Sequence, residues 1–166
     1  MSESQVVIRR ATTGDLAAVS SYGGELIRQH HAYDSQRFIG FDAIKIDLPV
    51  FYREQLVRED AAILVAELGG RIVGYAFVRL EAESFINLSD ATAWIHEIYV
   101  DESARGQGVS ALLMKAAINA ARRLGSGSVM LSVAPGNARA RKLFDRHGFR
   151  LTMHEMRLDL ADKEEP

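Results

Sequence analysis

The sequence predicts an α/β fold with a mostly antiparallel central sheet flanked by helices and one parallel pair of strands. Three observations support this fold class. Strand-like and helix-like stretches follow in the order β-α-α-β-β-β-α-β-α-β. The strand-like stretches 62–68 and 71–80 are separated only by Gly69 and Gly70, which is typical of a two-residue hairpin. The stretch 92–100 instead leads through glycines into a helix-like segment, an order that favours parallel pairing with the next strand.

The expected elements follow from hydrophobic periodicity and from turn residues. Thr12 and Asp15 form a capping-box pattern that opens the first helix, in which Gly23 and Gly24 mark a bend, and Gly148 follows the end of the last helix. The elements are a strand at 6–10, helices from 12 to about 29 and from 47 to 58, strands at 62–68, 71–80 and 92–100, a helix at 108–124, a strand at 128–133, a helix from 137 to about 147, a strand-like stretch at 149–160 and a charged tail at 162–166.

The composition indicates one globular domain that spans residues 1–166 and is long enough to bury a sizeable core. Hydrophobic residues make up 48% of the chain, which excludes a disordered protein. No apolar run approaches the roughly 18 residues of a membrane span, and the first residues lack the features of a signal peptide, so we expect a cytoplasmic protein without membrane contacts. The absence of cysteine excludes disulfides, a cysteine nucleophile and thiolate metal sites.

Residues 105–110 are the most informative part of the chain. They contain Gly106 and Gly108 and lie between an expected strand and an expected helix. Glycines at such a junction let backbone N–H groups point at a bound anion, and the helix adds the positive end of its dipole. Residues 103–144 carry seven Lys and Arg side chains and no Asp or Glu, which suits a polyanionic ligand, although each of these side chains alone also suits a solvated helix face. The sequence therefore predicts a phosphate-binding turn.

Two common phosphate-binding motifs do not fit this turn. Gly106, Gly108 and Ala111 match the G-x-G-x-x-A dinucleotide fingerprint, but no acidic residue for a ribose follows before Asp145, and too little chain remains for a doubly wound sheet. A Walker A loop requires Lys and then Ser or Thr directly after the glycines, and the sequence has neither there. The H-E-x-x-H and G-x-S-x-G motifs are also missing, so we expect no metal site and no serine nucleophile.

The turn instead resembles the acyl-CoA loop of the GNAT superfamily of N-acetyltransferases, whose pattern is R/Q-x-x-G-x-G/A. Arg105, Gly108 and Ser110 occupy its three defining positions, and Ser110 departs from the usual Gly or Ala. A second segment is similar to the family's N-x-x-A-x-x-L-Y-x-x-x-G-F motif, through Asn137, Ala140, Leu143, Phe144, Gly148 and Phe149. The order of the expected elements also agrees with the family fold. The resemblance therefore covers nearly the whole chain and implies a GNAT-type sheet whose parallel strands splay apart at the acyl-CoA site.

The resemblance implies that acetyl-CoA binds as the acyl donor. The N–H groups of residues 106–110 would bind the CoA pyrophosphate, and backbone groups of residues 98–100 would pair with the pantetheine arm like an added strand. Asn137 would hold that arm, cap the last helix or do both, and Phe144 would pack against the arm or the core. The implied acyl-CoA contacts are Ile98, Tyr99, Val100, Arg105, Gly106, Gln107, Gly108, Val109, Ser110, Asn137 and Phe144.

Glu97 is the candidate catalytic base. An alkyl amine is mostly protonated at pH 7, so its attack on a thioester needs a group that takes the proton, directly or through water. The resemblance implies this role for Glu97, because the family often carries an acidic base directly before the segment that pairs with pantetheine. The alternative is a Glu that forms a salt bridge on a sheet face. His96 is a second candidate base, but in a regular strand its side chain points to the opposite face.

The sequence leaves open which group protonates the leaving CoA thiolate. Many family members use the Tyr of the second motif, but Phe144 stands at that position and has no donor. Water, Tyr99 or another hydroxyl would then serve, or the thiolate would leave unaided.

The sequence thus predicts an acetyl-CoA-dependent N-acetyltransferase that transfers the acetyl group directly to a primary amine in a ternary complex. The alternative is a non-catalytic acyl-CoA-binding or sensing domain of the same fold. We expect a small-molecule or peptide amine as the acceptor, and residues 30–38 either shape its pocket or form an ordinary surface loop. We expect no nucleic-acid partner, because no aromatic residues interleave the basic ones. A homodimer is compatible with the sequence, although no segment indicates its interface.

Overall fold

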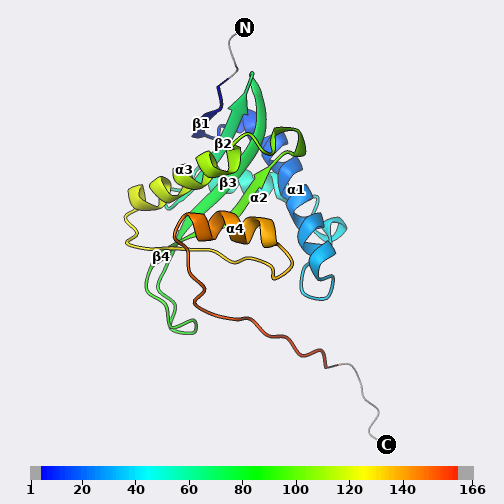
Figure 1. Ribbon diagram of the computed structural model, residues 1–166, viewed down its shortest axis with the longest axis vertical. Helices are drawn as coiled ribbons and strands as arrows, with labels where there is room; N and C mark the ends of the chain where they lie inside the picture. Colours follow the sequence, from blue (N-terminus) through cyan, green and yellow to red (C-terminus); the bar gives the residue numbers. More distant parts are fainter. Residues whose placement is uncertain (1–4, 161–166) are drawn as a thin grey trace, which may run out of the picture.

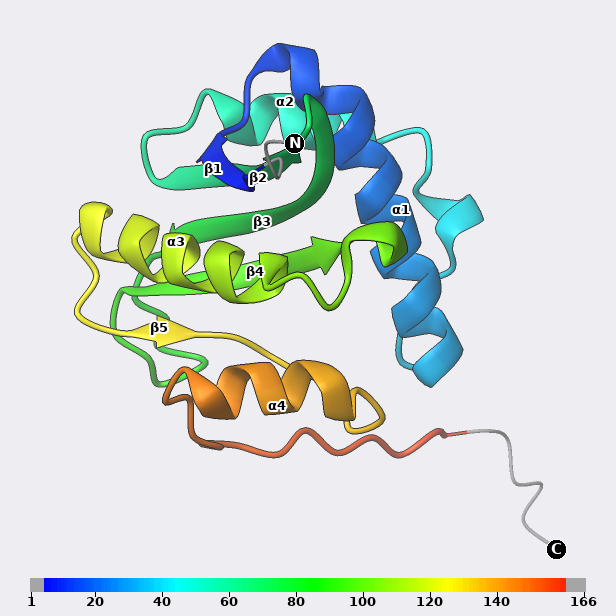
Figure 2. The same cartoon turned by 45° about the horizontal axis from the view of Figure 1, so that its top comes forward.

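Among residues 5–160, which this computed structural model describes, five strands form one central sheet in the order β1-β2-β3-β4-β5 (Figure 1; β5 is labelled in Figure 2). The elements along the chain are β1 (Val7–Arg10), α1 (Leu16–Tyr33), α2 (Leu48–Leu56), β2 (Ala61–Leu68), β3 (Arg71–Glu81), β4 (Thr92–Val100), α3 (Val109–Arg123), β5 (Val129–Met130) and α4 (Ala138–Arg146). Neighbouring strands are antiparallel, except that β4 and β5 are parallel. The predicted fold class is therefore confirmed.

Helices cover both faces of the sheet (Figures 1 and 2). On one face, α1 and α2 pack on apolar side chains of β2 and β3, with Tyr52 and Tyr75 at the centre of the cluster. On the other face, α3 buries Leu113 and Met114 against the sheet, and Phe144 of α4 joins the same cluster. Because both faces are covered, β2 is an almost continuous apolar run rather than an alternating one. No helix in the described part of the chain has the length and apolar character needed to cross a membrane.

The start of α1 confirms the predicted capping box. The backbone N–H and the hydroxyl of Thr12 donate to Asp15 Oδ2 at 2.8 and 3.0 Å. Arg9 of β1 adds a bidentate pair to the same carboxylate, at 2.7 and 2.9 Å. These contacts lower the pKa of Asp15 to about 2, with the Arg9 hydrogen bonds as the largest cause. The first strand and the first helix are thereby joined by one buried carboxylate.

The bend predicted at Gly23 and Gly24 does not occur, because α1 is one unbroken helix. The two glycines instead allow close packing. A Cβ atom at Gly23 would lie 2.1 Å from the hydroxyl oxygen of Tyr52, and one at Gly24 would lie 2.7 Å from the ring of Phe41. Small residues are therefore required here by tertiary contacts, which the sequence does not reveal.

The hairpin between β2 and β3 forms as predicted. Gly69 and Gly70 have φ angles of 58° and 78°, as a type I′ turn requires. The pairing Leu68 to Arg71 places these two glycines as the whole connection. Local turn chemistry therefore sets the register of the two central strands.

Two predicted strands in the last part of the chain are wrong or too long. The strand predicted at 128–133 is confined to β5, because the chain leaves the sheet after Met130. Residues 149–160 form no strand; they run without a paired neighbour, and their alternate apolar side chains Leu151, Met153, Met156, Leu158 and Leu160 are exposed. Alternation indicates which side chains share a face, but a strand also needs a hydrogen-bonded partner. The charged tail predicted at 162–166 lies outside the described residues, as do residues 1–4.

Candidate active site

β4 carries a bulge at His96. Val78 of β3 lies opposite Ile95, and Phe77 lies opposite Glu97, so His96 is an extra residue in the ladder. The bulge shifts the alternation of the strand, and the His96 ring stacks on Phe77 with centroids 5.3 Å apart. His96 and Glu97 therefore lie on the same face, the one covered by α1 and α2. The opposite orientation of His96 that a regular strand would give does not occur, because the bulge interrupts the alternation at this residue.

Two buried tyrosines hold the Glu97 carboxylate. Tyr52 of α2 and Tyr75 of β3 each donate a hydrogen bond from Oη to Glu97 Oε2, both at 2.9 Å. Both tyrosines are fully buried, and a buried tyrosine hydroxyl usually finds such an acceptor. Sequence reasoning missed both residues. The alternation along β3 places Tyr75 and Phe77 on one face, but the docking of α2, which brings Tyr52, leaves no signal in the sequence.

The protonation states of this cluster follow from its burial. Burial raises the pKa of Glu97, and the hydrogen bonds from Tyr52 and Tyr75 oppose part of that rise. Burial also raises the pKa of each tyrosine, so both hydroxyls stay protonated and act as donors. A carboxylate with a raised pKa is a stronger base near neutral pH than an ordinary Glu.

Glu97 lines a cavity of about 290 Å³ between α1, the loop that follows it and β4. The lining residues are Leu26, Ile27, His30, Phe38, Ile39, Trp94, Ile95, His96, Glu97 and Ser132. His30 and Phe38 belong to the region predicted to shape an acceptor pocket, and their rings pack edge to face with centroids 5.0 Å apart. Arg37 of the same region forms a salt bridge with Glu155 and lies 5.0 Å above the Phe38 ring. Part of the predicted region therefore contributes to the cavity, and part of it braces the loop.

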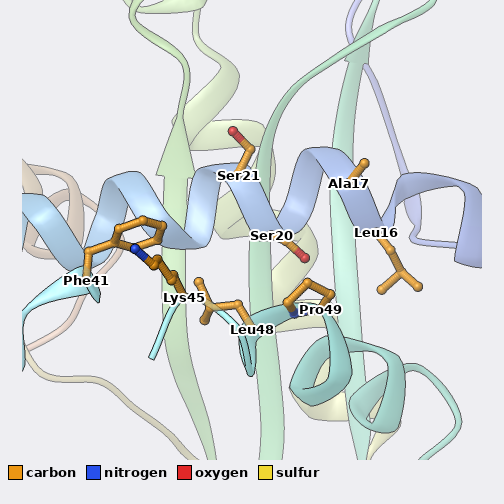
Figure 3. A pocket seen from close by; sticks show the side chains of 8 residues that line it. All are labelled: Leu16, Ala17, Ser20, Ser21, Phe41, Lys45, Leu48 and Pro49. Carbon is orange, nitrogen blue, oxygen red and sulfur yellow. The ribbon is translucent and has the colours of Figure 1, made fainter. Parts of the chain in front are cut away.

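A larger cavity, of about 510 Å³, lies between α1 and α2 (Figure 3). The figure shows that its walls come from the first half of α1, the start of α2 and the turn between them; the residues are Leu16, Ala17, Ser20, Ser21, Phe41, Lys45, Leu48 and Pro49. None of these described residues carries a carboxylate or an imidazole, and Lys45 is paired with Asp42 at 2.9 Å. We therefore place the candidate active site at the smaller cavity, which contains Glu97.

The glycine turn after β4 has the backbone geometry of an anion site. Gly106 and Gly108 have φ angles of 79° and 78°, a region that favours glycine. α3 begins directly after Gly108, and the N–H groups of Ala111 and Leu112 donate to the Gly108 carbonyl at 3.1 and 3.2 Å. The N–H groups that precede this ladder, including that of Ser110, are those that the first turn of a helix leaves for a ligand.

The side chains of the turn hold its shape. Arg105 Nε donates to the Val100 carbonyl at 3.1 Å, and Gln107 Nε2 donates to the Ser103 carbonyl at 3.1 Å. Val109 is buried in the core on the α3 face. The backbone of the turn, rather than these side chains, is therefore presented outward.

β4 has an open edge next to this turn. Ile98, Tyr99 and Val100 pair with β3 on one side. On the other side β5 pairs with β4 only at Ala93 and Trp94, and no other strand of the described chain continues along that edge. Figure 2 shows the chain after β5 turning toward α4 rather than following β4. The predicted separation of the parallel pair is therefore present, beside the glycine turn.

The two residues predicted from the second motif have clear structural roles. Asn137 caps α4, because its Oδ1 accepts from the Ala140 N–H at 3.1 Å. Phe144 is buried in the core cluster, with its ring centroid 6.0 Å from that of Phe149. Asn137 thus serves as a helix cap and Phe144 packs in the core, as one of the two predicted alternatives for each residue states. Contact of either residue with the pantetheine arm stays a prediction.

Comparison with known proteins identifies the family. The family model for the acetyltransferase (GNAT) family matches residues 27–149, which include Glu97, the glycine turn and α4. The chain belongs to the GNAT acetyltransferase family. The resemblance inferred from the two motifs is therefore confirmed.

Several relatives of this chain are named N-acetyltransferases. An uncharacterized N-acetyltransferase of Archaeoglobus fulgidus is 31% identical over 143 residues, which cover 82% of this chain and 88% of the relative. The uncharacterized N-acetyltransferase MJ1207 of Methanocaldococcus jannaschii is 32% identical over 100 residues, which cover 60% of this chain. This match covers 43% of MJ1207. Another match, to the putative phosphinothricin acetyltransferase YwnH of Bacillus subtilis, covers 32% of that protein. The chain therefore spans less than half the length of each of these two relatives.

Solved structures share the fold of this chain. A mutant of the BH1408 protein of Bacillus halodurans is 22% identical with a TM-score of 0.80, over 93% of this chain and 99% of that one. A predicted acetyltransferase of Clostridium acetobutylicum, solved with acetyl-CoA, is 19% identical with a TM-score of 0.69, over 94% of this chain and 97% of that one.

Proposed function

We propose that this chain is an acetyl-CoA-dependent N-acetyltransferase that transfers the acetyl group directly to a primary amine in a ternary complex. The observation that carries the proposal is Glu97, a carboxylate with a raised pKa in the wall of a small cavity, one residue before the open edge of β4. The family and the names of its relatives support acetyl transfer to nitrogen.

The glycine turn and the open edge are the parts that we assign to the coenzyme. Backbone N–H groups from Gly106 to Ser110 would donate to the pyrophosphate, at the positive end of the α3 dipole. The pantetheine arm would pair with the free backbone groups of Ile98 to Val100, as an added strand pairs with a sheet edge. This route leads from the turn to Glu97 and so carries the thioester to the cavity. A related fold has been solved with acetyl-CoA.

Glu97 would act as the general base. It takes a proton from the bound ammonium, directly or through one water, and the freed nitrogen lone pair attacks the carbonyl carbon of the thioester. The C–S bond then breaks and CoA leaves as the thiolate, while the acetylated nitrogen gives up its second proton to water to become the neutral amide. Tyr52 and Tyr75 both donate to Oε2, so we assign the proton to Oε1.

The leaving thiolate would take its proton from water or from another hydroxyl. Phe144, at the position of the family's tyrosine, has no proton to give and is packed in the core. A thiolate is a good leaving group, because thiols are far more acidic than amines or alcohols (cysteine has a pKa of about 8.5), so the lack of a built-in donor does not prevent the reaction.

The test is CoA release from acetyl-CoA, followed with a thiol reagent, across a panel of primary amines. We expect release that requires the amine and initial-velocity lines that intersect, as a ternary complex gives. Parallel lines would instead indicate an acetyl-enzyme intermediate. The second candidate function is a non-catalytic acyl-CoA sensor, which Phe144 favours. Tight acetyl-CoA binding without amine-dependent release would support the sensor and overturn the enzyme.

A further inference from the structure

The walls of the Glu97 cavity are apolar and aromatic. Leu26 and Ile27 come from α1, Phe38 and Ile39 from the loop after it, and Trp94 from β4. At about 290 Å³ the cavity lies at the lower end of the range for small-molecule sites. Such a site matches a ligand with a compact apolar body rather than a long or highly hydrated one.

The polar side chains that line the cavity are those of His30, His96, Glu97 and Ser132, and each imidazole has one nitrogen in a hydrogen bond. Of the described residues that line it, Glu97 alone carries a carboxylate. His30 Nδ1 lies 2.8 Å from the Leu26 carbonyl, and His96 Nε2 lies 2.7 Å from Glu81 Oε1. The cavity therefore offers one carboxylate for one ammonium group.

The charges next to the cavity are already paired. Glu81, which contacts His96, also forms a salt bridge with Arg79 at 2.7 Å. Arg37, which lies over the Phe38 ring, is paired with Glu155. A second ammonium group held inside the cavity would therefore meet apolar walls or balanced ion pairs, and burying an unpaired charge is costly.

We propose that the acceptor is a primary monoamine with a compact aliphatic or aromatic body, an inference that rests on the function proposed above. The ammonium group lies at Glu97, and the apolar body lies against Phe38, Ile39 and Trp94. Polyamines and aminoglycosides, which carry several ammonium groups, are disfavoured by the same walls.

The experiment compares two amines of equal length, n-hexylamine and 1,5-diaminopentane. They differ only in whether the far end is a methyl or an ammonium group. We expect kcat/KM for n-hexylamine to exceed that for the diamine by about tenfold or more, and 2-phenylethylamine to behave like n-hexylamine. Equal values, or a preference for the diamine, overturn the inference while leaving the proposed acetyl transfer intact.

Two variants and a control test whether the walls of the cavity set the preference for a monoamine over a diamine. Ile39→Glu adds a carboxylate to a half-exposed wall position and should shift the ratio of kcat/KM values toward the diamine by about tenfold. Phe38→Ala should raise the KM for 2-phenylethylamine without changing the KM for acetyl-CoA. Phe85→Ala, at a site 94% exposed and outside the cavity, is the matched control and should change neither. An unchanged ratio in Ile39→Glu overturns the assignment of the cavity.

Binding of the same two amines to the CoA-loaded protein, measured by calorimetry, separates the inference from the proposed function. Tighter binding of n-hexylamine supports the inference even if turnover fails. Tighter binding of the diamine contradicts it even if turnover succeeds. No acetylation of any amine would overturn the proposed function instead.

Discussion

We predict that the protonation of Glu97 sets the rate at a given pH. Glu97→Gln keeps the shape of the side chain and removes the proton acceptor, so we predict that kcat falls by about 10²–10⁴ while the Kd of acetyl-CoA stays unchanged. In the wild type the rate falls as the pH decreases through the Glu97 pKa, which burial raises, so this acidic limb lies above the value of about 4.3 for an ordinary Glu. Rate profiles against pH and calorimetry measure both effects. A kcat within about twofold of wild type, with chemistry limiting, contradicts the role of base.

We predict that Tyr52 tunes the pKa of that base rather than reacting itself. Tyr52→Phe removes one donor to Glu97 and leaves the burial in place, so the Glu97 pKa rises further and the acidic limb moves to higher pH. The expected shift is up to about one pH unit, because Tyr75 still donates. Tyr22→Phe is the matched control, since the Tyr22 hydroxyl donates to the Ile72 carbonyl at 2.8 Å instead. Identical pH profiles for wild type and Tyr52→Phe would contradict this positioning role.

A substitution at Gly108 tests the proposed anion site, and Gly70 offers a control position with similar backbone strain. Gly108→Val places a branched side chain on the outer surface of the turn, so we predict a large loss of acetyl-CoA affinity by calorimetry. Gly70, in the β2–β3 hairpin, has the same φ of 78° as Gly108. A Cβ atom added at either glycine would have no neighbour within 4 Å. Gly70→Val therefore carries a similar strain and should keep its affinity. If both folded variants bind acetyl-CoA like wild type, the turn is not the pyrophosphate site.

At the scale of elements, the contact between α1 and α2 decides how Glu97 is held. Alanine in place of glycine inside a helix usually stabilises by about 1 kcal/mol. At Gly23 the new Cβ would lie 2.1 Å from the Tyr52 hydroxyl, so Tyr52 must move. We predict that Gly23→Ala lowers the free energy of unfolding by about 1–3 kcal/mol in urea and shifts the acidic limb as Tyr52→Phe does. Ser21→Ala, at an exposed position of α1, should do neither. A more stable Gly23→Ala protein would refute the argument.

The elements that the sequence predicts well are those set by local chemistry. The hairpin at Gly69 and Gly70 and the turn at Gly108 need positive φ angles, and glycine supplies them wherever the rest of the chain lies. The bulge at His96 follows from pairing with β3, and the missing strand at 149–160 follows from the lack of a paired neighbour. Both depend on contacts between distant segments, which hydrophobic alternation does not encode.

At the scale of the whole molecule, the two halves of the candidate site differ in how far they could be predicted. The half that we assign to the coenzyme consists of backbone groups on consecutive residues, 98–110, and such a site needs glycines at fixed spacing. The acceptor half consists of side chains that packing brings together from α1, the loop at 38–39 and β4. No spacing rule ties those side chains together. The sequence therefore predicts the coenzyme half in detail and the acceptor half only as a region.

Binding of acetyl-CoA at the half of the site assigned to the coenzyme should also raise the stability of the whole molecule. A ligand that binds only the folded state stabilises it by about 2.7 kcal/mol at 100 times its Kd. For a chain of 166 residues this raises Tm by roughly 5–10 °C. Differential scanning fluorimetry with acetyl-CoA measures the shift.

Pantetheine is the matched control, because it has the arm that would pair with β4 but lacks the pyrophosphate assigned to the glycine turn. It should therefore give a much smaller shift in Tm. A Tm that does not move up to about 1 mM acetyl-CoA contradicts coenzyme binding. Equal shifts with pantetheine would place the binding energy on the open edge of β4 instead of at the turn.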